Sequence, residues 1–129
     1  MILLDTHVLV WLSLEPKKLS RKAREAIREA RAGTGVAVAS ITLFELAWLA
    51  ENGRIQVSGS VESFVRECVA KVIVRPITPE IAAQAVRFPA VYPQDPQDRI
   101  IGSTAVVENL PLVTADRRIR DSKLVTTIW

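Results

Sequence analysis

The chain has 129 residues, a length typical of one domain with its own hydrophobic core. It is 49% hydrophobic and 24% charged, which are values of ordinary globular proteins and exclude the disordered classes. No apolar run reaches the roughly 18 residues that a transmembrane helix needs, and the first residues lack the basic leader and cleavage site of a signal peptide. We therefore expect a single cytoplasmic domain spanning residues 1–129 with no membrane association.

The counts of cysteine and histidine exclude several kinds of site. The chain contains one cysteine, Cys68, and one histidine, His7. An internal disulfide and zinc sites built on several cysteine and histidine ligands are therefore excluded. A Ser-His-Asp arrangement would depend on His7 alone. The formal net charge is +3, which by itself is compatible with an anionic partner.

The predicted elements alternate between short apolar strands and helices along the chain. Residues 2–4 form the short, wholly apolar run that is typical of a strand buried on both faces of a parallel sheet. Further strands are expected at residues 35–40, 71–77, 110–115 and 124–128, and helices at residues 7–13, 20–33, 41–53, 60–71, 78–88 and 95–110, with one more between the last two strands. This order favours an α/β layered fold with a mainly parallel central sheet.

Asp5 is an isolated carboxylate within the apolar run of residues 1–14. An aspartate in apolar surroundings is costly unless it is hydrogen-bonded, paired with a cation or bound to a metal. Asp5 follows the first predicted strand, and ligands of open α/β sheets bind at the carboxyl ends of the strands. The alternative is that Asp5 and Thr6 only cap a helix beginning near His7.

The helix predicted from Ser20 carries a stripe of arginines. Seven of the 17 basic residues lie between residues 17 and 31, and four of them recur at helical spacing on one face: Arg21, Arg24, Arg28 and Arg31. Small and apolar residues line the opposite face, so the helix is amphipathic. Such a stripe suits a phosphate backbone, which makes these four arginines candidate RNA-binding residues. The alternative is a solvated face whose charge is tempered by Glu25 and Glu29.

Glu45 lies in the first turns of a helix that is apolar nearly all round, between Phe44 and Leu46. A helix of this kind is central to a core or forms part of a subunit interface. The alternative for Glu45 is a capping box with Thr42, in which the glutamate reaches back to the start of its own helix.

Two more acids lie at comparable places later in the chain. Asp95, followed by a proline, caps a predicted helix, so Asp98 lies in its first turn, where the helix dipole favours a negative charge. Asp116 follows the strand predicted at residues 110–115. In a parallel sheet Asp5 and Asp116 lie at the same edge, because both follow strand ends.

These acids form a candidate cluster without a basic partner: Asp5, Glu45, Asp98 and Asp116. Such a cluster repels itself and raises its own pKa values, and divalent cations are the usual remedy. Ligands that are all oxygen point to Mg²⁺ or Mn²⁺. Beside a basic surface, such cations suggest metal-assisted hydrolysis of a phosphodiester. A Walker-type phosphate loop is absent, which argues against hydrolysis of a nucleoside triphosphate.

The stretches around the four acids resemble a known family. They read LLDTHVLVWL, ITLFELAWL, DPQDRIIGSTA and PLVTADRRI, and in this order and spacing they are similar to the PIN domain, and within it to VapC-type ribonuclease toxins of type II toxin-antitoxin pairs. The resemblance runs from residue 1 to residue 129. It implies a Rossmann-like, three-layer α/β fold with helices on both faces of the sheet, and an endoribonuclease that depends on Mg²⁺ or Mn²⁺.

The resemblance also implies roles for particular residues. The four acids match the catalytic, metal-binding positions of the family, while Thr6, Thr114 and Asp95 match positions that support the site. His7 belongs to the first motif but is given no chemistry, so packing or hydrogen bonding is the default expectation. Implied partners are a transfer or ribosomal RNA as substrate, a small antitoxin with a DNA-binding domain, and a second copy of the chain. The apolar helix around Trp48 either contributes to that homodimer or belongs to the core.

Two other functions are compatible with parts of the sequence. One is a PIN domain that binds RNA or acts as a scaffold with weak or no catalysis. The other is an Mg²⁺-dependent phosphatase of the haloacid-dehalogenase type. That family has a second aspartate two residues after the first, where this chain has His7, which argues against it.

Overall fold

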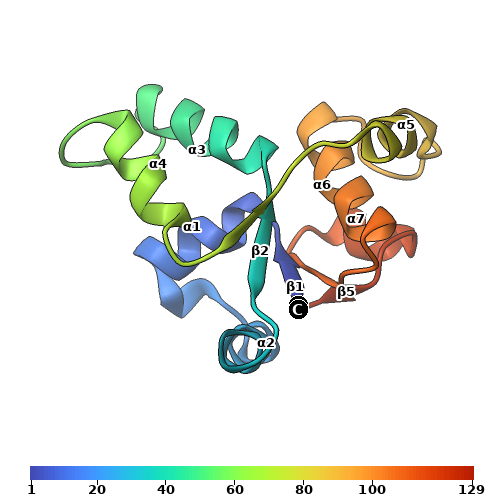
Figure 1. Cartoon of the computed structure of the whole chain (residues 1–129), viewed down its shortest axis with the longest axis horizontal. Helices are drawn as coiled ribbons and strands as arrows, with labels where there is room; N and C mark the ends of the chain where they lie inside the picture. The colour runs from blue at the N-terminus through green and yellow to red at the C-terminus, as the bar shows by residue number, and fades with distance from the viewer.

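A five-stranded, wholly parallel sheet forms the centre of the computed structural model, which describes residues 1–129 (Figure 1). The strands are β1 (Ile2–Leu4), β2 (Val36–Ala39), β3 (Ile73–Arg75), β4 (Leu112–Val113) and β5 (Thr127–Ile128). Their order across the sheet is β3-β2-β1-β4-β5. The predicted α/β class and the predicted order of elements are confirmed, and the sheet is parallel throughout.

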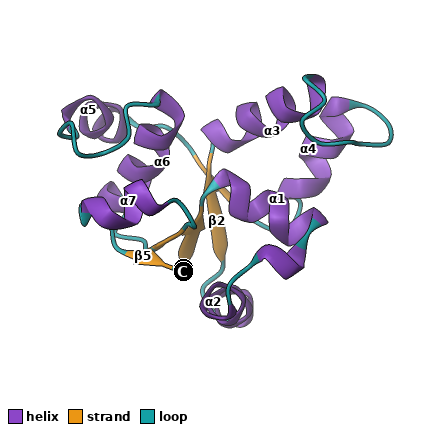
Figure 2. Ribbon diagram, turned by 180° about the vertical axis from the view of Figure 1, so that it is seen from behind, coloured by secondary structure: helices purple, strands orange, loops and turns teal.

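The helices cover both sides of this sheet. They are α1 (Thr6–Leu14), α2 (Arg21–Ala32), α3 (Ile41–Glu51), α4 (Val61–Val69), α5 (Pro79–Arg87), α6 (Pro96–Val107) and α7 (Arg117–Ser122), and a short 3-10 helix, η1 (Pro16–Lys18), follows α1. Figures 1 and 2 show α1, α3 and α4 on one side of β2, and α5, α6 and α7 on the other. The three-layer architecture is the predicted one. None of these helices has the length and hydropathy of a membrane span.

The strands divide the core into two parts because successive side chains of a strand point to opposite faces. Ile2 and Leu4 belong to the cluster beneath α1, α2 and α4, whereas Leu3 belongs to the cluster beneath α6 and α7. β2 repeats this alternation, with Val36 and Val38 in the first cluster. Both faces of the central strands are thus buried, as their wholly apolar sequences predict.

Helix starts follow the capping signals of the sequence. The hydroxyl oxygens of Ser20, Ser60 and Thr78 each accept a hydrogen bond from the backbone N–H three residues later, at 3.0–3.2 Å. A proline after Thr78 and another after Asp95 stand at the first helical position, where the missing N–H costs nothing. These caps fix where α2, α4, α5 and α6 begin.

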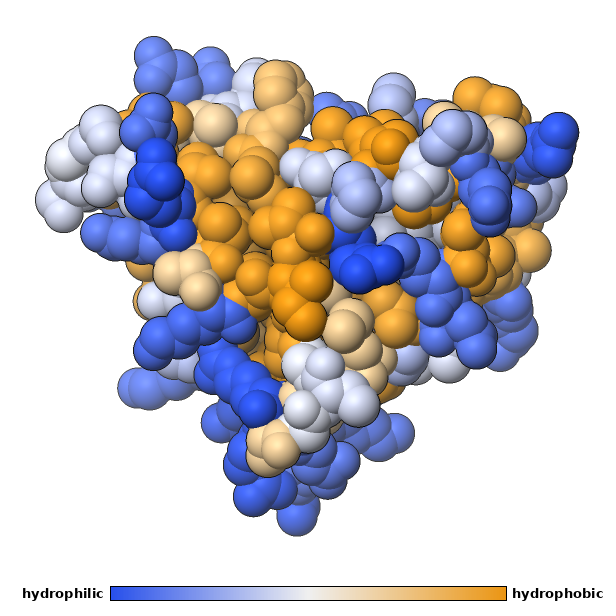
Figure 3. Space-filling view, viewed as in Figure 1, coloured by the Kyte–Doolittle hydropathy of each residue, from blue (hydrophilic) through white to orange (hydrophobic).

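Several predicted boundaries are wrong. The first helix begins at Thr6 rather than His7, because Asp5 caps it. The strands predicted at residues 71–77, 110–115 and 124–128 are shorter in the structure than predicted. Only part of each range pairs with a neighbouring strand. On the edge strand β3, Ile73 stays 41% and Val74 37% exposed. Figure 3 shows apolar side chains gathered over this part of the surface.

The strand order also sets the place of a ligand site. From β1 the chain adds β2 and β3 on one side and then returns to add β4 on the other side of β1. The carboxyl ends of β1 and β4 therefore meet where the strand order reverses, which is where open α/β sheets bind ligands. Asp5 follows β1, and Thr114 follows β4.

Candidate active site

Asp5 joins the ends of β1 and β4. Its side chain is buried, with the residue 4% exposed. Oδ1 accepts a hydrogen bond from the backbone N–H of Thr6 at 2.8 Å, and Oδ2 accepts one from the Thr114 hydroxyl at 2.7 Å. The first bond makes Asp5 the N-cap of α1, which was the alternative interpretation. The second reaches another strand, so Asp5 does more than cap its own helix.

Glu45 faces α1 and not the start of its own helix. Its Oε1 accepts a hydrogen bond from the Thr6 hydroxyl at 2.6 Å, and that hydroxyl lies 2.9 Å from the Thr42 hydroxyl. The capping box of Thr42 and Glu45 is therefore wrong, because both side chains are engaged by Thr6. Burial raises the pKa of Glu45, the bond from Thr6 lowers it, and the charges of Asp5 and Asp95 raise it further.

Asp98 is the acid most affected by its surroundings. It lies in the first turn of α6, with Asp95 as the cap: Asp95 Oδ1 accepts from the N–H groups of Gln97 at 2.8 Å and of Asp98 at 3.4 Å. Burial, followed by the charges of Asp5, Asp95 and Asp116, raises the pKa of Asp98 to about 7. In a large fraction of the protein molecules, Asp98 is therefore protonated at neutral pH when no cation is bound.

Tyr92 and Arg99 hold the start of α6 in place. The Tyr92 hydroxyl donates to the backbone carbonyl of Asp98 at 3.0 Å, and its ring packs where a side chain larger than that of Gly102 would collide with it. Arg99 donates to the carbonyls of Phe88 at 2.8 Å and Pro93 at 3.0 Å. The proline-rich stretch before α6 is thus fixed by backbone contacts that no sequence pattern indicated.

Asp116 is the N-cap of α7 and touches the same hydroxyl as Asp5. Its Oδ1 accepts from the N–H of Arg118 at 2.9 Å, and its own N–H donates to Thr114 Oγ1 at 3.1 Å. The Arg118 guanidinium lies 3.3 Å from Asp116 Oδ2 and 4.0 Å from Asp98 Oδ2. Arg118, a 70% exposed cation between two of the acids, was not predicted from the sequence. The Arg117-Arg118 pair directly after Asp116 was the signal that could have indicated it.

His7 forms a second link between the residues that follow β1 and those that follow β4. Its Nε2 accepts a hydrogen bond from the Ala115 N–H at 3.0 Å, so its proton is on Nδ1, which lies 3.7 Å from Asp5 Oδ2. The imidazole packs edge-on against Trp11, with ring centroids 4.9 Å apart. This is the hydrogen-bonding role expected of His7, directed at the loop that carries Asp116.

The four acids lie at one edge of the sheet, but their side chains are not arranged as a preformed metal-binding site. No three histidine, cysteine, aspartate or glutamate side chains lie close enough together to hold one metal ion. The donor chemistry nevertheless suits a hard cation, because it consists of carboxylate and hydroxyl oxygens. Burial is the main cause of the raised pKa values of Glu45 and Asp98, and the negative charges of neighbouring acids raise them further. A divalent cation would offset those charges.

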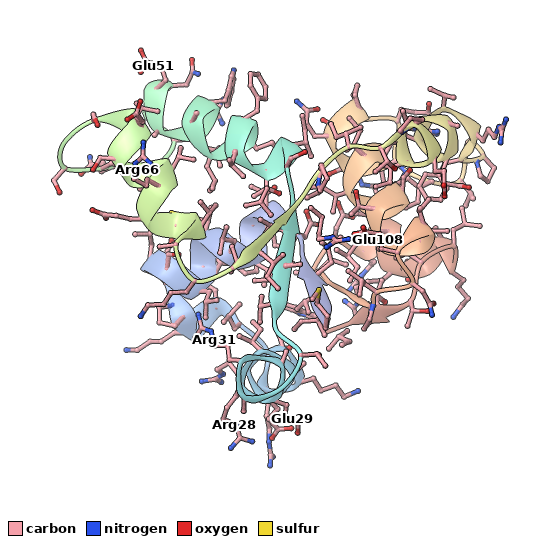
Figure 4. The ribbon with its side chains drawn as sticks, in the orientation of Figure 1. Arg28, Glu29, Arg31, Glu51, Arg66 and Glu108 are labelled. Carbon is pink, nitrogen blue, oxygen red and sulfur yellow. The ribbon has the colours of Figure 1, made fainter.

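The structure does not bring the basic stripe to these acids. All four arginines of the stripe are exposed on α2, and Arg21 pairs with Glu25 at 3.2 Å. Figure 1 shows α2 at the end of the sheet where β2 begins, whereas α3, which carries Glu45, follows the end of β2. In Figure 4, Arg28 points away from the body of the protein. An RNA held by this stripe would have to extend around the domain to reach the acids.

Comparisons with known proteins agree with this architecture. Residues 2–123 match the model of the PIN domain family. Over 130 residues the chain is 45% identical to Ribonuclease VapC22 of Mycobacterium tuberculosis (strain ATCC 25618 / H37Rv), covering 99% of this chain and 98% of that protein.

Solved structures give the same picture. A DNA-bound VapBC from Salmonella typhimurium is similar with a TM-score of 0.73 and 20% identity, covering 98% of this chain and 97% of that one. A toxin-antitoxin complex from Klebsiella pneumoniae is similar with a TM-score of 0.63 and 25% identity, covering 90% of this chain and 87% of that one.

Proposed function

The chain belongs to the PIN domain family, and on this premise we propose that it is a metal-dependent endoribonuclease acting as the toxin of a toxin-antitoxin pair. The observation that carries the proposal is a chain of hydrogen bonds at the switch point of the sheet. Thr6 donates from its backbone to Asp5 and from its hydroxyl to Glu45. The Thr114 hydroxyl donates to Asp5 and accepts from the backbone of Asp116.

In this proposal the acids hold Mg²⁺ or Mn²⁺ and the threonines hold the acids. Asp5, Asp98 and Asp116 are the proposed ligands, with Glu45 completing the set. A cation bound there would activate water and offset negative charge on the phosphodiester oxygens. Rigid support of the ligands matters because outer hydrogen bonds set the orientation of the groups that bind a metal.

When a cation binds, Asp98 would lose its proton and the Arg118 side chain would move. Asp98 has to give up its proton before it can bind a cation, because only the carboxylate is a ligand. Arg118 offers the acids a positive charge and is largely exposed, so it can turn away to solvent when another cation takes its place. Freed in this way, its guanidinium would be available to a phosphate oxygen of the RNA.

The proposed substrate is RNA, a transfer or ribosomal RNA in particular, and the proposed partners are a small antitoxin with a DNA-binding domain and a second copy of the chain. Two similarities support this: the 45% identical relative is a ribonuclease, and the similar structures are toxin-antitoxin complexes, one of them DNA-bound. The test is cleavage of RNA by the purified chain with Mg²⁺ or Mn²⁺, compared with the same reaction in EDTA.

One observation favours a second function, an RNA-binding PIN domain with little catalysis. The acids do not converge into a group of three that could hold a metal ion. RNA binding that survives chelation, combined with no cleavage in either metal, would support this second function.

A further inference from the structure

A groove of about 470 Å³ adjoins the acids, between α3 and the start of α6. Its lining consists of Phe44, Glu45, Trp48, Leu49, Asp95 and Gln97. Glu45 belongs to this groove and to the hydrogen-bonded site, so the groove is continuous with the place where we propose that a phosphodiester is cut. Figures 1 and 2 both show α3 and α6 at the same end of the sheet, where β2 finishes.

Two aromatic side chains of the groove remain open to solvent. Phe44 is 57% and Trp48 46% exposed, and they lie four residues apart on α3, a spacing that puts them on the same face of the helix. The other two tryptophans, Trp11 and Trp129, pack against each other with ring centroids 5.8 Å apart. Exposed aromatic faces are costly in water, whereas stacking of unpaired nucleobases on such faces is favourable and tolerant of sequence.

Polar groups complete the groove. Asp95 Oδ1 accepts two backbone N–H bonds, while Oδ2 and the side-chain amide of Gln97 make no hydrogen bond within the chain. A carboxylate oxygen and an amide are suited to the amino and carbonyl groups at the edges of bases. Outside the groove, the guanidinium of Arg54 lies 5.7 Å from the Trp48 ring centroid and makes no ion pair. Arg54 thus makes a cation–π contact but has no carboxylate partner, so its charge could meet a phosphate.

We infer that this groove holds an unpaired nucleobase of the RNA substrate, stacked on Trp48, next to the phosphodiester that the acids cut. The inference rests on the proposed function and adds to it a preference for single-stranded RNA. The competing occupant is a second copy of this chain. That occupant is disfavoured by Glu45 and Asp95, because burying the free oxygens of two carboxylates in an apolar protein interface is costly.

The test is the affinity of a short single-stranded RNA of mixed sequence, measured by fluorescence anisotropy in Mg²⁺. An Asp98→Asn background prevents cleavage, and the Trp48→Leu and Trp48→Phe changes are compared in it. We expect Trp48→Leu to weaken binding by roughly 5- to 150-fold, the range found when one stacked base is lost. Trp48→Phe should keep most of the affinity, because a phenyl ring still stacks. The matched control is Leu124→Ala, an exposed apolar residue that lines a different cavity.

Two further measurements decide between the occupants, the binding of duplex RNA and the molar mass in solution. Duplex RNA should bind the Trp48→Leu protein and its parent equally, because a duplex offers no unstacked base. If Trp48→Leu changes the molar mass in light scattering from dimer to monomer but leaves the RNA affinity unchanged, the groove is an interface between copies and the inference is wrong. Equal RNA affinity with unchanged mass also overturns it, while cleavage by the wild-type chain would leave the proposed function intact.

Discussion

The Thr114 hydroxyl donates to Asp5 Oδ2 at 2.7 Å, although the two residues lie 109 positions apart in the chain. The same oxygen accepts the N–H of Asp116 at 3.1 Å. One buried hydroxyl thus fixes the position of two acids, at the point where β1 and β4 meet. Loss of this hydroxyl should therefore disturb the positions of both acids.

Replacing Thr114 with valine should destabilise the protein and impair the site together. Valine has the same shape but no hydroxyl, so Asp5 loses a partner and the Asp116 N–H loses an acceptor. We expect a loss of about 1–3 kcal/mol in the free energy of unfolding by urea, together with slower RNA cleavage. The matched control is Thr126→Val, since the hydroxyl of Thr126 is exposed and makes no hydrogen bond. Equal effects of the two changes would show that the Thr114 bond is unimportant.

Asp98 should make the metal-free protein less stable as the pH rises. Its pKa rises from 3.8 to about 7 on folding, so between these values the folded chain binds more protons than the unfolded chain. The free energy of unfolding in EDTA should therefore fall from about pH 4 to pH 7. Asp98→Asn should flatten this slope and stabilise the protein at pH 8 by on the order of 1–3 kcal/mol.

Urea unfolding at pH 5 and pH 8 measures this effect. Asp121→Asn is the control, because Asp121 is an exposed acid of α7 that forms no ion pair. An Asp98→Asn protein that is less stable than the wild type at pH 8 would contradict the conclusion that the charged form of Asp98 destabilises the metal-free fold.

His7 should position the loop after β4. A glutamine amide can accept the Ala115 N–H roughly where Nε2 does, whereas leucine cannot. We expect His7→Leu to lower kcat for RNA cleavage with a smaller effect on KM, and His7→Gln to restore most of the loss. Hydrogen exchange of the Ala115 amide reports the same bond directly. If glutamine and leucine behave alike in both measurements, His7 contributes packing alone.

The basic stripe should act on binding and not on chemistry. Arg24 and Arg28 are exposed and form no ion pair, and α2 lies at the opposite end of the sheet from the acids. Replacing both with glutamine should weaken RNA binding and lower the salt slope by about 1 per arginine that contacts a phosphate. Arg66→Gln on α4 is the control, because Arg66 is already paired with Glu62. An unchanged slope would indicate that the stripe is only a solvated face.

Local signals account for what could be predicted from the sequence. Apolar runs placed the strands, and caps such as Thr78 and Asp95 placed the helix starts, because both depend on neighbouring residues. The same signals placed the four acids at strand ends and in the first turns of helices. Together with the parallel sheet, these signals predicted that Asp5 and Asp116 share an edge.

The remaining features depend on contacts between distant segments. For Glu45 the sequence left a capping box open beside the catalytic interpretation, because nothing near it in the chain indicates that Thr6 donates to it from another helix. The bond between His7 and Ala115 spans 108 positions. The distance between the basic stripe and the acids is a property of the strand order, which the alternation of strands and helices does not specify.

RNA cleavage by the purified chain tests the central claim most directly. The reaction uses a pool of small RNAs with Mg²⁺ or Mn²⁺, beside EDTA and beside Asp5→Asn and Asp98→Asn proteins prepared identically and shown by circular dichroism to be folded. We predict metal-dependent cutting by the wild type that is lost in EDTA and in both variants. Equal cutting by the folded variants, or by the wild type in EDTA, would contradict the claim that these carboxylates form a metal-dependent active site.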